Sequence, residues 1–323
     1  MNKNRIQTAI SKIALHTAGI GMLMAGMSMT VICGAAKQSN QSTTYQAFNP
    51  ATMAFDLTKP IQYQLPDPDK FGSGPYPVFI WTPGTLELYN DALSNLFISQ
   101  MASRGFLAAT VSYDYGTDSS GVKDCRDYTE RAQGVFDVSR STSAAAVLCA
   151  LSNADCGKGI VTSGVSQGGF LSVLARNYAP NVKATYALSM SDYNKNTGVS
   201  SSSCVDKQYT AIPANRLTIV NGASDPLFAG PQSLENVSGY TCPDGATQCW
   251  SPDNSGAGWY IVQDSQVKSA LAGHCYFLMN GCGVIEQGDP DWMPPSSFNW
   301  SLATNLNWLA TFGTQRVFSP TGQ

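Results

Sequence analysis

Short apolar runs alternate with longer amphipathic segments along most of the chain. The runs are rich in β-branched and aromatic residues and predict buried strands at 77–82, 106–113, 159–165, 183–189, 216–221 and 259–262. Segments with helical spacing or a high alanine content separate them and predict helices at 90–103, 138–151, 170–176 and 299–312. Because the strands alternate with helices, we expect an α/β domain with a mostly parallel central sheet and helices on both faces.

A Gly-Val-Ser-Gln-Gly-Gly motif, residues 164–169, joins the predicted strand 159–165 to the predicted helix 170–176. A strand, a sharp Gly-x-Ser-x-Gly turn and a helix together form a nucleophile elbow, in which the strained and closely packed backbone needs glycine. The motif alone also fits a glycine-rich turn in a serine-rich chain. Its position between a strand and a helix favours Ser166 as a nucleophile, and such a serine needs a base.

After residue 36 the chain contains a single histidine, His274, which follows the last predicted strand. Asp225 follows the strand 216–221 in a Gly-Ala-Ser-Asp-Pro segment, where a carboxylate can hold an imidazole in one tautomer. The chain order serine, aspartate, histidine is the order of α/β-hydrolases. Two alternatives stay open: His274 has a structural role, or Asp192, after the strand 183–189, takes the place of Asp225.

Two backbone N–H groups are expected to bind the oxyanion that forms when a serine attacks a carbonyl group. The N–H of Gln167 directly follows the candidate nucleophile. The second is expected from Thr85, in the Thr-Pro-Gly-Thr-Leu segment 82–86, where Gly84 allows a close backbone approach. The alternative for this segment is an ordinary Pro-Gly turn.

The chain has nine cysteines, and eight of them follow Cys33. Six of these form three pairs with one shared spacing, which leaves two others as a fourth pair; the expected disulfides are Cys149–Cys156, Cys242–Cys249, Cys275–Cys282 and Cys125–Cys204. Sequence proximity is the only basis for this choice among many possible pairings. A zinc site would need Cys-x-x-Cys clusters with histidine, and none is present, so we expect no metal and no organic cofactor. Disulfides indicate an oxidising compartment.

Residues 1–36 have the pattern of a secretory signal peptide: a basic start, an apolar Met-rich middle and small residues at the end. We expect cleavage after Ala36. The alternatives are a lipoprotein acylated on Cys33 and a segment retained as a membrane anchor. The polar residues 37–47 are expected to form a flexible linker, and 48–323 a single catalytic domain.

The charge of the chain argues against nucleic acid as a partner. The net charge is −3, and loss of residues 1–36 removes three basic residues and no acidic one, which leaves a net charge of −6. No basic patch is visible in the sequence. We expect no nucleic-acid partner, and a monomer that acts on a small-molecule or polymeric ester substrate.

Three segments carry a resemblance to a known family: VFIWTPGT at 78–85, SRGFLAATVSY at 103–113 and GVSQGG at 164–169. From about residue 50 to 312 the chain resembles secreted bacterial α/β-hydrolases of the dienelactone-hydrolase-like type, including polyester hydrolases of the cutinase and PET-hydrolase kind. The resemblance implies hydrolysis of carboxylic esters through an acyl-enzyme. Thr85 and Gln167 stand where polyester hydrolases usually have an aromatic residue and a methionine, so an aromatic polymer is not implied as the substrate.

The prediction is a secreted serine esterase on an α/β-hydrolase fold without a large lid domain, because 190–215 holds only a short serine-rich loop. The insertion 228–258 contains Tyr240 and Trp250 and is followed by Trp259; these aromatics either line a substrate pocket or belong to a disulfide-braced surface loop. Acyl transfer, amide or peptide hydrolysis and polyester depolymerisation are the enzymatic alternatives. The non-enzymatic alternative is an exported binding module that has kept the fold without activity.

Overall fold

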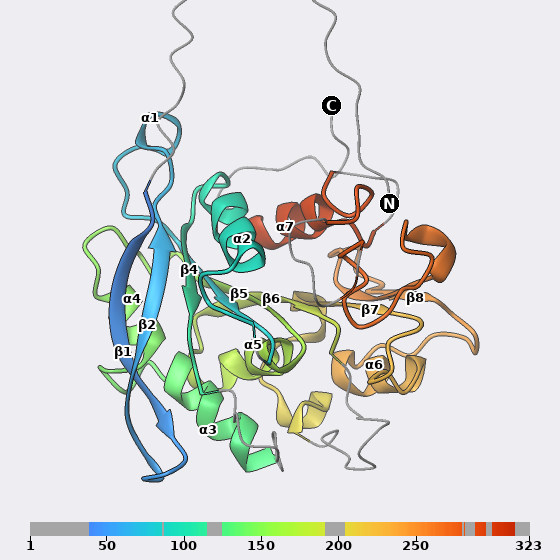
Figure 1. The fold of residues 1–323 in the computed structure, drawn as a ribbon, viewed down its shortest axis with the longest axis horizontal. Coiled ribbons are helices and arrows are strands. Elements are labelled where there is room, and N and C mark those ends of the chain that lie inside the picture. The colour runs from blue at the N-terminus through green and yellow to red at the C-terminus, as the bar shows by residue number, and fades with distance from the viewer. Residues whose placement is uncertain are drawn as a thin grey trace, which may run out of the picture. The chain divides into compact units, whose positions relative to one another are not determined.

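The computed structural model describes residues 39–85, 87–114, 125–190, 204–279, 281, 288–294 and 299–313. In these residues one nine-stranded sheet has the strand order β1-β2-β4-β3-β5-β6-β7-β9-β8 (Figure 1). The strands are β1 (Gln41–Asn49), β2 (Ala54–Gln64), β3 (Val78–Thr82), β4 (Leu107–Val111), β5 (Ile160–Val165), β6 (Val182–Leu188), β7 (Leu217–Gly222), β8 (Gln248–Trp250) and β9 (Gly258–Val262).

The central strands β4, β3, β5, β6, β7 and β9 pair in parallel, whereas β1, β2 and β8 pair with their neighbours in antiparallel fashion. The helices are α1 (Pro68–Phe71), α2 (Ala92–Ala102), α3 (Cys125–Phe136), α4 (Ala144–Cys149), α5 (Gln167–Tyr178), α6 (Pro231–Ser238) and α7 (Leu302–Ala310), with short 3-10 turns at Lys207–Tyr209, Ala214–Arg216 and Asp264–Gln266. The parallel strands all end at the same edge of the sheet, so the residues that follow them are neighbours in space.

Helices cover both faces of the sheet because alternate residues of each central strand point to opposite sides. In β3, Val78 and Ile80 belong to a buried cluster with α3, α4, α5 and α6. Phe79 and Trp81 belong to a second cluster with α2 and α7. Figure 1 shows these two sets of helices above and below the sheet. The predicted α/β fold class, a mostly parallel sheet with helices on both faces, is therefore confirmed.

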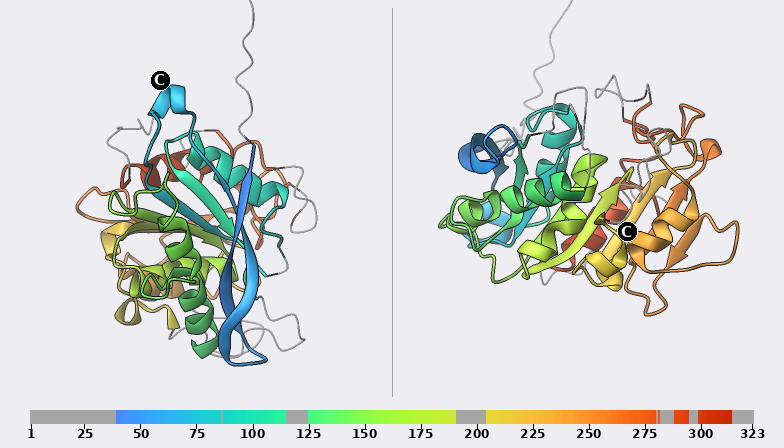
Figure 2. Two further views of the ribbon diagram at one scale, coloured as in Figure 1. Left: turned by 90° about the vertical axis from the view of Figure 1, so that its left-hand side faces the viewer. Right: turned by 90° about the horizontal axis from the view of Figure 1, so that it is seen from below.

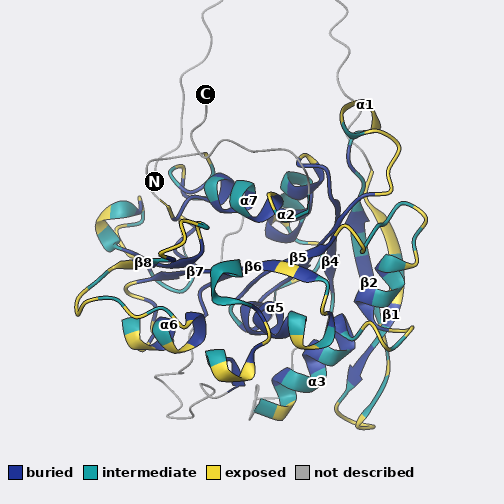
Figure 3. Ribbon diagram, turned by 180° about the vertical axis from the view of Figure 1, so that it is seen from behind, coloured by how far each residue is buried: buried dark blue, intermediate teal, exposed yellow. Residues whose placement is uncertain are grey.

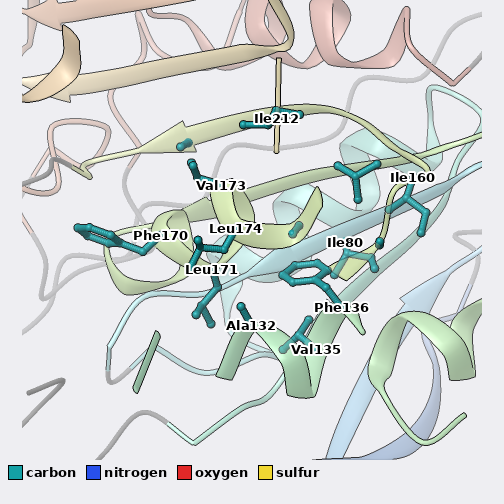
Figure 4. Close-up of a cluster of buried hydrophobic side chains, with 14 of the residues drawn as sticks. Ile80, Ala132, Val135, Phe136, Ile160, Phe170, Leu171, Val173, Leu174 and Ile212 are labelled. Carbon is teal, nitrogen blue, oxygen red and sulfur yellow. The ribbon is translucent and has the colours of Figure 1, made fainter. Parts of the chain in front are cut away.

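The largest apolar core lies where α5 and α3 pack on the sheet. Figure 4 shows Leu171 of α5 beside Ala132 of α3, and Phe136 of α3 close to Ile80 of β3, and all four side chains are buried. The central strands are buried apart from Lys183 in β6, while the outward faces of the surrounding helices are exposed or partly exposed (Figure 3). This core fixes the strand-to-helix turn that precedes α5.

The prediction of a flexible linker at 37–47 is wrong for the part that the structure describes. Residues Gln41–Asn49 form β1, which pairs with β2 in a long twisted hairpin at the edge of the sheet (Figure 2). Tyr45, Ala47 and Phe48 are buried, although most of the segment is polar. An edge strand needs only one apolar face, so a few buried residues are enough to anchor it. Residues 1–36, with the expected signal peptide and Cys33, lie outside the described residues.

The helix expected at 138–151 is shorter than predicted. Only Ala144–Cys149 is helical (α4), because Ser143 caps its start by accepting the Ala146 N–H and a turn around Asp137 precedes it. The longer crossover helix is α3. Most of its residues are polar, but Tyr128, Ala132 and Phe136 are buried. The other predicted strands and helices are present with small shifts at their ends. No helix of the described residues has the length and apolar character needed to cross a membrane.

Candidate active site

Ser166 lies in the sharp turn between β5 and α5. Its backbone has φ 54° and ψ −125°, a conformation that residues with a side chain rarely adopt. The Ser166 N–H donates to the carbonyl of Leu188, at the end of the neighbouring strand β6, at 2.9 Å. The turn is therefore tied to the carboxyl edge of the sheet, as a nucleophile elbow requires.

Two glycines make this turn possible because the backbone has no room for side chains beside it. A β-carbon on Gly164 would lie 2.3 Å from the Gly168 carbonyl oxygen, and one on Gly168 would lie 2.0 Å from the Thr82 carbonyl oxygen. The hydroxyl of Thr82 donates to the Gly168 carbonyl at 2.7 Å. The first turn of α5 thus packs directly on the end of β3.

Asp225 and His274 are in contact. Asp225 Oδ2 lies 2.8 Å from His274 Nδ1, and Asp225 Oδ1 accepts the Leu227 N–H at 2.8 Å. The Asp225 side chain is 1% exposed and that of His274 is 20% exposed. A carboxylate only accepts hydrogen bonds, so Nδ1 carries the ring proton and the unprotonated Nε2 is left as the basic nitrogen.

The loops that carry these two residues are joined by Asp264, which follows β9. Asp264 Oδ2 accepts the Ser224 hydroxyl at 2.9 Å, and its Oδ1 accepts the Ala272 N–H at 2.7 Å. The Ser224 N–H donates directly to the Ala272 carbonyl at 2.9 Å. One carboxylate therefore holds the segment before Asp225 and the segment before His274 in one arrangement.

Ser189, directly after β6, supports the histidine from a third strand end. Its hydroxyl donates to the His274 carbonyl at 2.5 Å, and its backbone has a φ of 48°. The sequence reasoning missed both Ser189 and Asp264. The available signal was their position, since each is among the first polar residues after a strand of the parallel sheet.

The predicted oxyanion residues lie side by side. The Thr85 hydroxyl donates to Gln167 Oε1 at 3.4 Å, and the β-carbon position of Gly84 lies 3.3 Å from Ser166 Cβ. Within the described part of the chain, neither the Thr85 N–H nor the Gln167 N–H donates to a protein acceptor. The segment 82–85 thus approaches the candidate nucleophile as the sequence predicts.

Glu87 is an acidic group that the sequence reasoning did not single out. Its Oε2 accepts the Gly84 N–H at 2.7 Å, and the side chain is half-buried. Burial raises the pKa of Glu87 to about 7, and the nearby charge of Asp91 adds to this effect. The hydrogen bond from Gly84 and the charge of His274 oppose it. A titratable carboxyl group therefore lies close to both Ser166 and His274.

No hydrogen bond joins Ser166 Oγ to His274 in the residues that the structure describes. Such catalytic contacts are often long in unliganded proteins and tighten around the substrate. Asp192, the alternative acid, lies outside the described residues. Among the residues that are described, no group of three or more histidine, cysteine or acidic side chains is placed to hold a metal ion.

Three of the predicted disulfides are present: Cys125–Cys204, Cys149–Cys156 and Cys242–Cys249. Cys275 is also disulfide-bonded, and its expected partner, Cys282, lies outside the described residues. In the insertion 228–258 the Cys242–Cys249 bond connects the loop after α6 to β8.

Two of the three aromatics of this region brace the structure. Trp259 is fully buried in the core, and its indole N–H donates to the Tyr240 carbonyl at 3.2 Å. The Tyr240 hydroxyl donates to Ser251 Oγ at 2.8 Å. The contacts of Tyr240 therefore favour the interpretation as a braced surface segment over that as a substrate pocket, and Trp259 is a core residue.

Comparisons with known proteins give structural similarity only. No protein-family model matches the chain, and no curated protein does. The hypothetical protein PA2218 from Pseudomonas aeruginosa shares 17% identity and a TM-score of 0.38 over 54% of this chain and 50% of its own. An acylaminoacyl peptidase from Pyrococcus horikoshii shares 16% identity and a TM-score of 0.49 over 85% of this chain and 41% of its own.

A putative dienelactone hydrolase from Klebsiella pneumoniae shares 15% identity and a TM-score of 0.40, over 70% of this chain and 85% of its own. The chain thus spans half of the Pseudomonas protein and less than half of the peptidase. At these identities and TM-scores the similarities say nothing about the activity of the chain.

Proposed function

We propose that the chain is a serine hydrolase that cleaves carboxylic esters through an acyl-enzyme. The observation that carries the proposal is the hydrogen-bonded pair of His274 and the buried Asp225 at the same sheet edge as Ser166, which occupies a strained strand-to-helix turn. A serine hydroxyl is a weak nucleophile until a base accepts its proton. The imidazole, held through Nδ1, supplies that base at Nε2.

The proposed reaction has two halves. Ser166 Oγ attacks the ester carbonyl carbon while its proton passes to His274 Nε2, and the N–H groups of Gln167 and Thr85 bind the resulting oxyanion. The oxyanion collapses, the bond to the alcohol oxygen breaks, and His274 returns the proton to the leaving alcohol. Water then attacks the acyl-enzyme by the same route and releases the carboxylic acid and free Ser166. Asp225 stabilises the imidazolium that forms in each half.

We also propose that the protein works outside the cytoplasm. Disulfides persist in oxidising compartments, and three are found in the described residues. The basic and then apolar sequence of residues 1–36 is consistent with export, either as a cleaved signal peptide or as a lipoprotein acylated on Cys33.

The test is covalent labelling by a fluorophosphonate together with hydrolysis of p-nitrophenyl esters of increasing acyl length. We expect labelling at Ser166, and loss of both labelling and turnover in Ser166→Ala by about 10⁴-fold or more in kcat. Ser152→Ala, on an exposed loop, is the matched control and should behave as wild type. A matching p-nitroanilide panel and added alcohol acceptors distinguish ester hydrolysis from amide hydrolysis and acyl transfer. Labelling at another serine, or a wild-type protein without any turnover, would exclude the proposal.

A further inference from the structure

We propose that Glu87 is a positioning residue for this reaction: its carboxyl group holds the Gly84 N–H and thereby fixes the backbone that presents the Thr85 N–H to the oxyanion. The inference rests on the proposed function and goes beyond it, because it assigns a role to a side chain outside the serine, histidine and aspartate. It is carried by the contacts of Glu87 with the loop after β3.

Glu87 is bonded to both polar groups of Gly84. Glu87 Oε2 accepts the Gly84 N–H at 2.7 Å, and the Glu87 N–H donates to the Gly84 carbonyl at 3.2 Å. The Gly84 carbonyl and the Thr85 N–H belong to one planar trans peptide and therefore point in opposite directions. With its carbonyl held towards Glu87, this peptide directs the Thr85 N–H away from Glu87.

The peptide held in this way lies against the candidate nucleophile. A β-carbon on Gly84 would be 3.3 Å from Ser166 Cβ and 3.3 Å from Glu87 Oε2, so both side chains approach the same point beside Gly84. On the far side of Thr85, its hydroxyl reaches Gln167 Oε1, beside the first expected oxyanion donor. A rotation of the Gly84–Thr85 peptide would replace an N–H donor by a carbonyl oxygen at this position.

Glu87 is itself anchored to a helix. The next residue, Leu88, donates its N–H to Asp91 Oδ2 at 3.2 Å, and its carbonyl accepts the Ser94 hydroxyl at 2.9 Å. Asp91 caps α2 by accepting the Ser94 N–H, and Ser94 Oγ accepts the indole N–H of Trp81 in β3. The carboxyl group of Glu87 therefore links the loop to a helix that is fixed on the sheet.

Stability alone does not account for an acid at this position. Burial of a carboxyl group disfavours its charged form, and Asp91, on the adjoining helix end, disfavours it further, while the hydrogen bond from Gly84 and the charge of His274 favour it. A neutral side chain that accepts the same hydrogen bond would be less costly to bury. The contact with Gly84 gives the side chain a function in the site, because the Gly84 N–H needs an acceptor oxygen at this position.

The experiment compares Glu87→Ala, Glu87→Asp and Glu87→Gln with wild type on a p-nitrophenyl ester. Loss of one oxyanion donor lowers kcat by about 10²–10³-fold in serine hydrolases, so we expect a fall of about 10–100-fold for alanine with KM changed less than about threefold. Aspartate keeps the charge but is one methylene too short for the Gly84 N–H, and should lose a similar factor. Glutamine keeps an acceptor oxygen at the right length and should restore most of kcat.

A trifluoromethyl ketone, which forms an oxyanion when Ser166 adds to it, gives a second measurement. Its inhibition constant should rise in parallel with the fall in kcat for alanine and aspartate, and stay near the wild-type value for glutamine. Glu130→Ala, on α3, is the matched control and should change neither value. Circular dichroism and thermal unfolding establish whether each variant is folded. If Glu87→Ala does not fold, Glu87→Asp provides the test of the lost contact in its place.

Two results separate failure of this inference from failure of the proposed function. An active, labelled wild type with unchanged kcat in Glu87→Asp, or with equal loss in glutamine and alanine variants, would overturn the role of Glu87 alone. A wild type that neither reacts with the fluorophosphonate nor hydrolyses any ester would overturn the proposed function and this inference with it.

Discussion

The Ala272 N–H donates to Asp264 Oδ1 at 2.7 Å, two residues before His274. The other oxygen of this carboxylate accepts the Ser224 hydroxyl, one residue before Asp225. Asp264 thus joins the loop that carries Asp225 to the loop that carries His274. Their 2.8 Å contact depends on a link outside the pair itself.

Asp264→Ala should lower both stability and activity. Two hydrogen bonds to a charged acceptor are lost, which destabilises the fold by about 2–4 kcal/mol. The imidazole also loses part of its support, so kcat should fall by about 10-fold or more, since small displacements of a catalytic group carry large rate penalties. Urea unfolding and p-nitrophenyl ester kinetics measure the two effects.

Asp253→Ala provides the comparison for Asp264. Asp253 accepts several hydrogen bonds in the loop before β9, at the opposite end of that strand from Asp264. The substitution Asp253→Ala should lower the free energy of unfolding and leave kcat unchanged. Equal effects of the two substitutions on kcat would show that Asp264 does not act through the candidate site.

Asp225→Asn should leave the fold intact and lower kcat by about 10⁴-fold, because an amide no longer holds the imidazole in the required tautomer. Asp192→Asn should change little. Ester hydrolysis by the two purified variants, with circular dichroism as the check on folding, decides between the two acids. A silent Asp225→Asn and an inactive Asp192→Asn would reverse the assignment.

Glu87 should make stability depend on pH in a direction opposite to that of most acidic residues. Since burial raises its pKa from 4.5 to about 7, the folded protein binds this proton more tightly than the unfolded chain. Between about pH 4.5 and 7 the unfolded state loses the proton first, so the free energy of unfolding falls as pH rises, by at most about 3 kcal/mol.

Glu87→Gln removes this dependence. Urea unfolding at several pH values measures the free energy of unfolding of both proteins. Relative to Glu87→Gln, wild type should be more stable below about pH 5 and less stable above about pH 7. Asp91 and His274, the charged neighbours of Glu87, are present in both proteins and do not produce the difference. A stability difference that stays constant across this range would contradict the raised pKa.

The Cys125–Cys204 disulfide should contribute more to stability than either short-loop disulfide. It spans 79 residues, whereas Cys149–Cys156 and Cys242–Cys249 each span 7. In the chain-entropy model the long loop corresponds to about 4 kcal/mol and a short loop to about 2 kcal/mol. Unfolding of variants in which both cysteines of one disulfide are replaced by serine measures how much each disulfide contributes to stability. Separately, peptide mapping without reduction should recover Cys275 joined to Cys282. A larger loss from a short-loop variant would mean that native contacts, and not loop length, set the contribution.

The fold class and the candidate residues Ser166, Asp225 and His274 could be predicted from the sequence because each depends on local order. Buried parallel strands appear as apolar runs, and functional side chains follow them at one edge of the sheet. The elbow needs glycine at fixed positions on either side of the serine. The physical reason is that a β-carbon at Gly164 or Gly168 would collide with neighbouring backbone atoms.

What the sequence did not reveal depends on partners that only the fold brings together. Asp264 joins Ser224 to Ala272 through contacts that span 40 and 8 residues of sequence, and no local pattern marks it. Glu87 acts on Gly84 across a loop whose shape the apolar pattern does not specify. The polar segment of β1 becomes a strand because β2 pairs with it and supplies a core for Tyr45.

The β1–β2 hairpin also limits how far the chain can be shortened from its amino-terminal side. Removal of residues up to about 40 leaves the hairpin whole, because β1 begins at Gln41. Removal of β1 would leave the backbone groups of β2 that face it unpaired, and would uncover Ile61 and Tyr63, which share the core with Tyr45. An unpaired strand beside exposed apolar side chains is a template for edge-to-edge association. A protease that trims this end past β1 would therefore produce a chain that self-associates, with the candidate active site left in place.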